Sequence, residues 1–240
     1  MELKMFSIFK KKYLRINSID SKQGHNLYLS DYNIPQNKLN TLCKKYGCDK
    51  GIFEGFNDYF SWFPHNYTDI YDSIFYDKRN DVKKVFELGI GTNKVFNEKF
   101  KRVSIPGASL RIWRDYFKYA DIYGGDIDSK TLFQEKRIKT FLVDQTNQKS
   151  IQKMWKQIKN KNFDIIIDDG LHNFNAATTF FENSINKLSK YGFYFIEDIF
   201  HKEIDIYLDY FSNKNYRINF FSIKNRVIQV DNNLLMIRHA

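Results

Sequence analysis

Carboxylates that follow two buried strands are the side chains of this sequence best placed to do chemistry. The run from Phe163 to His172 reads Phe-Asp-Ile-Ile-Ile-Asp-Asp-Gly-Leu-His, and the next apolar run ends in Glu197 and Asp198. Each run is apolar enough for a parallel strand that is covered on both faces. The carboxyl ends of such strands are where open α/β sheets bind ligands. The acids and the histidine therefore predict a metal site with a base beside it.

The segments that must position these acids alternate between strand and helix from Lys83 onward. Apolar runs predict strands at 83–88, 121–126, 139–143, 163–168 and 191–197. Apolar residues at three and four spacing predict helices at 108–118, 130–136, 147–160 and 174–189. A helix near 202–212 and two β-like runs, 216–223 and 226–238, follow. This alternation indicates an α/β fold with a parallel sheet, to which the last two runs add a hairpin.

Three earlier strand ends carry the marks of a nucleoside site. The first runs into Gly89 and Gly91 but lacks the third glycine of a dinucleotide fingerprint, so a phosphate cradle is disfavoured. The second ends in Asp126, whose carboxylate can accept hydrogen bonds from both hydroxyls of a ribose. The third ends in Asp144 and Gln145, which suit an adenine amino group. A single acid of this kind caps a helix about as often as it binds a ligand, but three in succession predict a nucleoside-type cofactor.

Five segments carry these motifs in one order, namely Glu87–Gly91, Gly107–Trp113, Tyr123–Asp128, Asp164–His172 and Tyr194–Ile199. The order resembles the class I S-adenosylmethionine-dependent methyltransferases. More narrowly, it resembles the metal-dependent sugar O-methyltransferases related to the macrocin and mycinamicin enzymes. The likeness covers about residues 83–200, and the combination of Asp-Asp-Gly-x-His with Glu-Asp is its most specific part.

The resemblance implies a Rossmann-like methyltransferase fold, with a mostly parallel seven-stranded sheet, a C-terminal antiparallel hairpin and a helical N-terminal cap. We accordingly divide the chain into a cap and substrate-lid region at 1–80 and an S-adenosylmethionine-binding catalytic domain at 81–240. One departure from the family is an insertion, Lys94 to Ile105, before Gly107. Its basic residues are expected to cover the cofactor or to meet substrate phosphates.

The resemblance also implies roles for single residues. S-adenosylmethionine would be bound by Glu87, Gly89, Gly91, Ser109, Asp126, Ile127, Asp144, Gln145 and Asp168. Mg²⁺ or a similar ion would be ligated by Asp169, Glu197 and Asp198, with Asp169 and His172 as the catalytic residues and His172 as the general base. Asp168 is assigned to the cofactor side because side chains alternate along a strand, so Asp168 and Asp169 point to different places.

Residue chemistry agrees with this assignment. Mg²⁺ prefers hard oxygen ligands, and three carboxylates leave room for two oxygens of a sugar diol. A hydroxyl bound there becomes more acidic, and a histidine can remove its proton near neutral pH. The alternatives are a packing or capping role for His172 and, for Glu197 and Asp198, the favourable position of acids at the start of a helix.

Composition limits the possible binding partners and the cellular location of the protein. The net charge of +10 and the pI near 9.3 admit nucleic acid, but the basic residues are spread along the chain, which favours a solvated surface. Cys43 and Cys48 form no disulfide or zinc pattern, which is typical of a reducing cytoplasm. No apolar run approaches the roughly 20 residues of a membrane span, and the first residues lack a signal-peptide core.

We expect an S-adenosylmethionine- and Mg²⁺-dependent O-methyltransferase that acts on a sugar hydroxyl of a nucleotide sugar or of a glycan precursor. His65 and Tyr67 are assigned to the substrate. The alternatives are a phenolic, catechol-like acceptor, a nucleic-acid acceptor, and a cofactor-binding protein without catalysis. Nucleic acid is disfavoured because no Asn/Asp-Pro-Pro-Tyr motif occurs and both cysteines precede the sheet. The sequence leaves open whether the protein forms a homo-oligomer.

Overall fold

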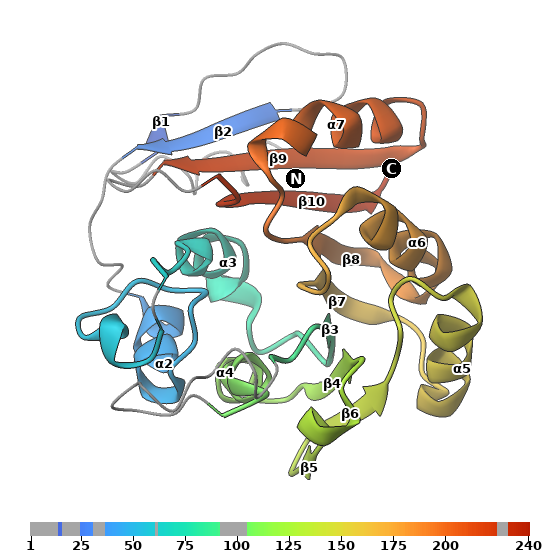
Figure 1. The fold of residues 1–240 in the computed structure, drawn as a ribbon, viewed down its shortest axis with the longest axis horizontal. Helices are drawn as coiled ribbons and strands as arrows, with labels where there is room; N and C mark the ends of the chain where they lie inside the picture. The colour runs from blue at the N-terminus through green and yellow to red at the C-terminus, as the bar shows by residue number, and fades with distance from the viewer. Residues whose placement is uncertain (1–13, 16–24, 31–36, 61, 92–104, 225–229) are drawn as a thin grey trace.

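The computed structural model describes residues 14–15, 25–30, 37–60, 62–91, 105–224 and 230–240 (Figure 1). In this part of the chain the strands form one ten-stranded sheet of order β1-β2-β9-β10-β8-β7-β3-β4-β6-β5. The insertion predicted at 94–105 falls, up to residue 104, outside the described residues.

Five strands predicted from apolar runs form the centre of the sheet. They are β3 (Lys84–Leu88), β4 (Asp121–Asp126), β6 (Ile138–Leu142), β7 (Phe163–Asp168) and β8 (Leu188–Ile196). All four pairings among them are parallel. The antiparallel pair β9 (Tyr216–Lys224) and β10 (Asn233–His239) joins them through β8. These seven strands confirm the predicted methyltransferase sheet with its C-terminal hairpin.

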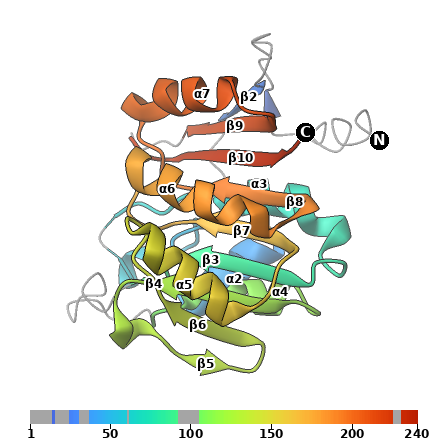
Figure 2. The same cartoon turned by 90° about the vertical axis from the view of Figure 1, so that its right-hand side faces the viewer.

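Helices cover both faces of this sheet, as Figure 2 shows. One face carries α5 (Gln148–Ile158) and α6 (Phe174–Ser184), followed along the chain by α7 (Ile204–Ser212), and the other carries α4 (Ala108–Tyr116). The alternation of β7 divides its side chains between two cores, because Ile165 and Ile167 join one cluster and Ile166 joins the other. A strand buried on both faces holds its last residues rigidly at the rim of the sheet.

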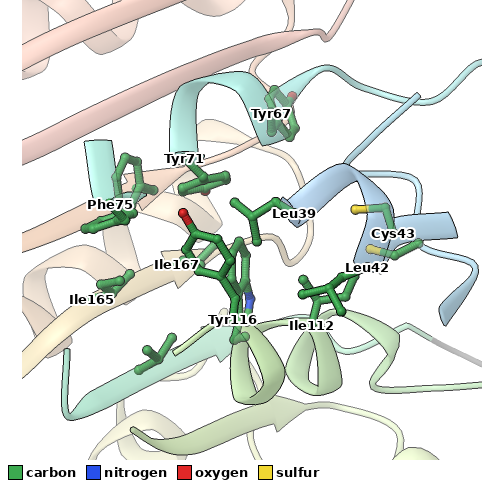
Figure 3. Packing of buried hydrophobic residues seen from close by; sticks show 14 of the residues in the cluster. Leu39, Leu42, Cys43, Tyr67, Tyr71, Phe75, Ile112, Tyr116, Ile165 and Ile167 are labelled. Carbon is green, nitrogen blue, oxygen red and sulfur yellow. The ribbon is translucent and has the colours of Figure 1, made fainter. Parts of the chain in front are cut away.

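The N-terminal region packs on the face that carries α4. It contains α2 (Lys38–Tyr46), the 3₁₀ turns η1 (Phe56–Asp58) and η2 (Tyr76–Lys78), and α3 (Tyr67–Phe75). Leu39 of α2, Tyr71 of α3 and Ile112 of α4 belong to one hydrophobic cluster with the strand residues Ile165 and Ile167, part of which is drawn in Figure 3. The same region also supplies β1 (Leu14–Arg15) and β2 (His25–Ser30), and β2 pairs in parallel with β9. The expected cap is thus helical over the site and extended at the edge of the sheet.

The helix predicted at 130–136 is wrong. The segment forms a 3₁₀ turn, η3 (Ser129–Thr131), and then β5 (Gln134–Glu135), which pairs antiparallel with β6. The hairpin turn is made by Arg137, whose φ of 63° is left-handed. The Oγ1 of Thr140 accepts a hydrogen bond from the backbone N–H of Phe133 and donates one to its carbonyl, at 2.6 Å each. These bonds satisfy the backbone groups that a helix would have paired.

An ion-pair junction joins α2 to α4. The Oδ2 of Asp115 accepts hydrogen bonds from Tyr46 Oη at 2.5 Å and from Lys45 Nζ at 3.0 Å, and its Oδ1 accepts one from Arg114 Nε at 2.9 Å. Burial acts against ionisation of Asp115, but bonds from Tyr46, Lys45 and Arg114 lower its pKa to about 2. The junction therefore holds α2 against α4.

Replacing Asp115 with Asn is expected to lower the free energy of unfolding by about 1 kcal/mol at pH 7, a value reduced for solvent screening. The folded pKa lies below the usual value, so the stabilisation is present above about pH 4 and is lost as pH falls towards 2. Urea unfolding at several pH values measures this. An equal difference between wild type and Asp115→Asn at pH 7 and at pH 2.5 would contradict it.

None of the helices in the described ranges is long and apolar enough to cross a membrane.

Candidate active site

A cavity of about 400 Å³ opens at the carboxyl ends of the central strands, between the sheet and the loop after α2. Seven of the residues predicted to bind the cofactor line it, namely Gly89, Gly91, Ser109, Asp126, Ile127, Asp144 and Gln145. Five of the residues predicted to bind the metal, to act as the base or to bind the substrate line the same cavity, namely Asp169, Glu197, Asp198, His172 and His65. Glu87, Asp168 and Tyr67 are buried behind its wall.

Asp126 is fixed at the end of β4. Its Oδ2 accepts a hydrogen bond from the backbone N–H of Ile90 at 3.0 Å, and its Oδ1 accepts one from that of Asp128 at 2.9 Å. A carboxylate can accept further bonds on its remaining lone pairs. The next residue, Ile127, is 67% exposed in the cavity wall although it is apolar. A hydrogen-bond acceptor beside an apolar surface suits a ribose joined to a flat base.

Asp168 acts on the cavity through Gln145. The Nε2 of Gln145 donates to both oxygens of Asp168, at 2.8 and 2.9 Å, and its Oε1 accepts from the backbone N–H of Leu171 at 2.8 Å. Burial raises the pKa of Asp168 to about 7. Asp168 is thus a positioning residue that holds one carboxamide in place, and it does not line the cavity.

Gly89 lets the glycine-rich turn approach the end of β7. Its φ of 81° is left-handed, and a Cβ at this position would lie 1.9 Å from the backbone oxygen of Asp169. Its N–H donates to the carbonyl of Gly125 at 2.8 Å. Gly91, with φ of 82°, has the same backbone hand. Only glycine fits at residue 89 without displacing Asp169.

Asp169, His172 and Asp198 form a compact cluster at the mouth of the cavity. Each offers one ligand atom, and these atoms lie within 4.8 Å of one another. The Nε2 of His172 lies 3.2 Å from Asp169 Oδ1 and 3.5 Å from Asp198 Oδ2. Both His172 and Asp198 adopt left-handed backbone, with φ of 52° and 55°. Strained residues concentrate at functional sites because the surrounding structure must hold them.

Glu197 and Glu87 face a buried lysine on the inner side of this cluster. The ammonium of Lys50 contacts Asp169 Oδ2 at 2.6 Å, Glu87 Oε1 at 3.1 Å and Glu197 Oε2. Glu87 also accepts a hydrogen bond from Trp113 Nε1 at 2.6 Å. Burial acts against the charge of Lys50, but Asp169, Glu197 and Glu87 raise its pKa well above the usual value. Glu87, predicted to bind the cofactor, is therefore an ion-pair partner beneath the cavity.

Two tyrosines of α3 hold the adjacent acids at the end of β8. Tyr67 and Tyr71 are four residues apart and so lie on one face of the helix. Tyr67 Oη donates to Asp198 Oδ1 at 2.7 Å, and Tyr71 Oη donates to Glu197 Oε1. His65 stacks on Tyr67 with ring centroids 4.8 Å apart, and its Nε2 lies 3.5 Å from Asp198 Oδ1. The structure places Tyr67 on Asp198, with its side chain out of the cavity.

The charge on His172 follows from its carboxylate neighbours. Burial acts against protonation, but the hydrogen bond to Asp169 and the charges of Asp198 and Asp169 raise its pKa to about 10. The same contacts lower the pKa of Asp169 to about 2 against its burial, together with the charge of Lys50. A carboxylate that stays ionised at neutral pH is the form that binds a hard cation, so Asp169 fits a divalent ion.

Comparison with known proteins finds similarity to enzymes named as O-methyltransferases. The chain is 34% identical to a mycinamicin VI 2''-O-methyltransferase of Micromonospora griseorubida over 137 residues, 57% of this chain and 32% of that one. It is 32% identical over 138 residues to an 8-demethyl-8-alpha-L-rhamnosyl tetracenomycin-C 2'-O-methyltransferase of Streptomyces olivaceus, 58% of this chain and 34% of that one. A demethylmacrocin O-methyltransferase of Streptomyces fradiae is 33% identical over 135 residues, 56% and 32% of the two chains.

The chain resembles the macrocin- and mycinamicin-type sugar O-methyltransferases. The matched segment spans about a third of the length of these curated relatives. No protein-family model matches the chain.

Solved structures of a methyltransferase share the fold of this chain. The MycE methyltransferase from the mycinamycin biosynthetic pathway, solved with Mg and SAH, superposes with a TM-score of 0.58 at 23% identity, over 86% of this chain and 55% of that one. A second crystal structure of MycE also contains mycinamycin VI. The Rossmann-like methyltransferase fold is thereby shown for this chain.

Sequence reasoning missed Lys50 and Tyr71 as parts of the candidate site. Lys50 closes the run Tyr-Gly-Cys-Asp-Lys, which lies in the region predicted as a cap. Tyr67 and Tyr71 share a helical face, and this four-residue spacing is the one signal that could have paired them with two adjacent acids. Lysine is almost never fully buried unless it is paired, so nothing local distinguished Lys50 from a surface residue.

Proposed function

We propose that this chain is an S-adenosylmethionine-dependent, divalent-metal-dependent O-methyltransferase that acts on a sugar hydroxyl. The observation that carries the proposal is one cavity in which a nucleoside-type site, around Asp126 and Gln145, adjoins the Asp169, His172 and Asp198 cluster. A methyl donor bound at the first would face a hydroxyl held at the second. The names of the relatives support the same reaction.

The cofactor is proposed to lie along the carboxyl ends of β3, β4 and β6. Asp126 would accept from the ribose hydroxyls, Gln145 and Asp144 would flank the adenine, and Ile127 would cover its face. Gly89, Gly91 and Ser109 lie in the wall where the methionine part would sit. S-adenosylmethionine supplies an electrophilic methyl group on sulfonium.

We propose that Asp169 and Asp198 would hold Mg²⁺ or a similar ion beside the acceptor. A bound ion supplies Lewis acidity, which makes a sugar hydroxyl easier to deprotonate. Glu197, predicted with these ligands, has both oxygens engaged, by Lys50 and by Tyr71, so it would ligate only through a remaining lone pair.

His172 is proposed as the general base. Its Nε2 faces the two carboxylates and would take the hydroxyl proton there. The charges of Asp169 and Asp198 raise the pKa of His172, and a cation held by these carboxylates would offset their charges and favour the neutral imidazole that acts as a base. The hydroxyl oxygen then forms a bond to the methyl carbon as the carbon–sulfur bond breaks. The products are a methyl ether, a thioether and a proton on His172.

An aromatic and acidic wall supports a sugar as the acceptor. Trp62, in the cavity wall, donates from Nε1 to Asp49 Oδ2 at 2.7 Å, and its ring stacks on Phe60 with centroids 5.4 Å apart. A flat indole beside a carboxylate offers both a stacking surface and a hydrogen-bond acceptor to a polyhydroxylated ring. We propose a nucleotide sugar or a precursor of a polysaccharide or glycoside as the substrate.

Turnover is expected to require a divalent ion. With a panel of nucleotide sugars and glycosides, purified protein and S-adenosylmethionine should give a product heavier by one methyl group. Excess chelator should lower the rate by about 100-fold or more, because the acceptor loses its Lewis acid, and Mg²⁺ should restore it. Binding of S-adenosylmethionine, measured by calorimetry, should persist in chelator.

Undiminished turnover in chelator would sink the metal-dependent mechanism. Methylation confined to catechols in the same screen would replace the sugar by a phenolic acceptor, and turnover suppressed by random oligonucleotides in a salt-dependent way would favour a nucleic acid. Cofactor binding without any methylated product would indicate a cofactor-binding protein without catalysis.

A further inference from the structure

The charged and ionisable side chains around the proposed metal site fall into a buried group and a more exposed group, called here the buried half and the open half. Lys50, Glu87 and Glu197 form the buried half, with side chains 5%, 0% and 1% exposed. The open half contains His172 at 35% and Asp198 at 12%. Asp169, at 23%, lies between them. An ion that arrives from the cavity therefore meets the open half first.

Asp169 divides its two oxygens between these halves. Its Oδ2 accepts from Lys50 Nζ at 2.6 Å, whereas its Oδ1 lies 3.2 Å from His172 Nε2. Asp198 Oδ2 lies 3.5 Å from the same nitrogen. Asp169 Oδ1 and Asp198 Oδ2 thus face His172, whereas Asp169 Oδ2 faces Lys50.

The ammonium of Lys50 contacts acids from three different strand ends. Glu87 belongs to β3, Asp169 follows β7 and Glu197 follows β8. Carboxylates packed this closely repel one another in a region of low dielectric, so the sheet needs a cation at this point. Lys50 reaches it from the loop after α2, which means that the cap supplies a charge that the sheet lacks.

We propose that Lys50 is a resident counter-cation of the metal site. Its positive charge offsets the negative charges of Glu87, Asp169 and Glu197, and so weakens the attraction of these carboxylates for a divalent ion. Lys50, which lines the cavity, acts here as a positioning residue for the proposed reaction. The inference rests on the proposed function, since it presumes a divalent ion at these carboxylates.

This role predicts an effect of opposite sign to that of an ordinary supporting residue. A residue that merely orients ligands weakens metal binding when it is removed, commonly by about 10–100-fold. Removing a neighbouring positive charge instead strengthens the attraction of the remaining carboxylates for a divalent ion. The neutral variant Lys50→Met should therefore bind the ion about tenfold more tightly or better, and it should be destabilised without it because buried carboxylates lose their partner.

The test compares the metal response of wild type, Lys50→Met, Lys50→Arg and Lys45→Met. Melting temperatures with and without Mg²⁺ or Mn²⁺, and the dissociation constant by calorimetry, are the readouts. Lys45 is the matched control, since it pairs with Asp115 at 3.0 Å outside the cavity. Lys50→Met should melt lower than wild type in chelator and gain more from the ion, as binding to the folded state requires. Lys45→Met should respond as wild type does, and Lys50→Arg, which keeps the positive charge, should not show the tighter binding of Lys50→Met.

A metal response of Lys50→Met equal to or weaker than that of wild type would overturn the proposal. If Lys50→Met does not fold, the same comparison is made between Glu197→Gln and Lys50→Met/Glu197→Gln, where one negative charge fewer needs a partner, and the double variant should bind the ion more tightly. Wild type that neither binds a divalent ion nor needs one for turnover would refute the proposed function itself. Wild type that does both, beside an unchanged Lys50→Met, would refute only the role of Lys50.

Discussion

Replacing His172 with Asn is expected to lower kcat by about 10²–10⁴-fold, the usual contribution of a general base. The proposed base lies at the cluster of Asp169 and Asp198, where its Nε2 is 3.2 Å and 3.5 Å from the two carboxylates. Asn is the suitable replacement because the φ of residue 172 is 52°, a conformation that Asn tolerates better than Ala. Single-turnover rates with saturating cofactor and Mg²⁺ measure the chemical step.

The same variant should keep its ligands, which separates loss of the base from loss of the site. S-adenosylmethionine should bind with an affinity close to that of wild type, since the ion-pair partners of His172 are the carboxylates of Asp169 and Asp198, which are proposed to bind the metal. The Mg²⁺-induced rise in melting temperature should remain. His239→Asn, at the opposite end of the sheet from the cavity, is the matched control and should turn over normally. A His172→Asn enzyme within tenfold of wild type would remove His172 from the mechanism.

Gly89→Ala is expected to lower the free energy of unfolding by about 2–4 kcal/mol and to abolish most turnover, because left-handed strain and a steric clash act together. The added methyl would lie 1.9 Å from the backbone oxygen of Asp169. Backbone cannot move aside as a flexible side chain can, so Asp169 must shift. Small displacements of a ligand are costly to a reaction that depends on alignment.

Gly55→Ala is the matched control for this variant. Gly55 has the same φ of 81°, but a Cβ there meets only Asp58 Oδ2 at 3.8 Å. Gly55→Ala should therefore lower the free energy of unfolding by about 1 kcal/mol, the cost of the left-handed conformation alone, and should retain turnover. Chemical denaturation and initial rates of both variants give the comparison. Equal losses in the two would show that the contact with Asp169 costs nothing.

The parallel core of the fold was predictable because its signals are local. The run Ile165 to Ile167 is apolar on both faces, which predicted β7, and Gly89 and Asp126 mark strand ends by residue type alone. The segment at 130–136 misled because its apolar spacing suits a helix, whereas Thr140 and the left-handed Arg137 make it a hairpin. Strand β2 was missed because its stability comes from β9, near the other end of the chain.

The candidate site was predictable where motif and strand end coincide. The acids Asp169 and Asp198 and the base His172 meet as their spacing predicted, and their roles stay predictions. The partners of these acids were hidden, because Lys50 and Tyr71 reach them through tertiary packing and carry no spacing relation to them. The assignment of Glu87 and Asp168 to the cofactor stays a prediction, and the structure adds that Glu87 is bonded to Trp113 and Asp168 to Gln145.

The parallel pairing of β2 with β9 has a consequence for the order in which the molecule assembles. Lys50 meets Asp169 and Glu197 at sequence separations of 119 and 147. Contacts between such distant segments slow folding, since long loops must close before the contacts are made. Tyr67 and β2 of the N-terminal region also contact residues of the C-terminal segment. We therefore expect the buried ion pairs of Lys50 to form late in folding.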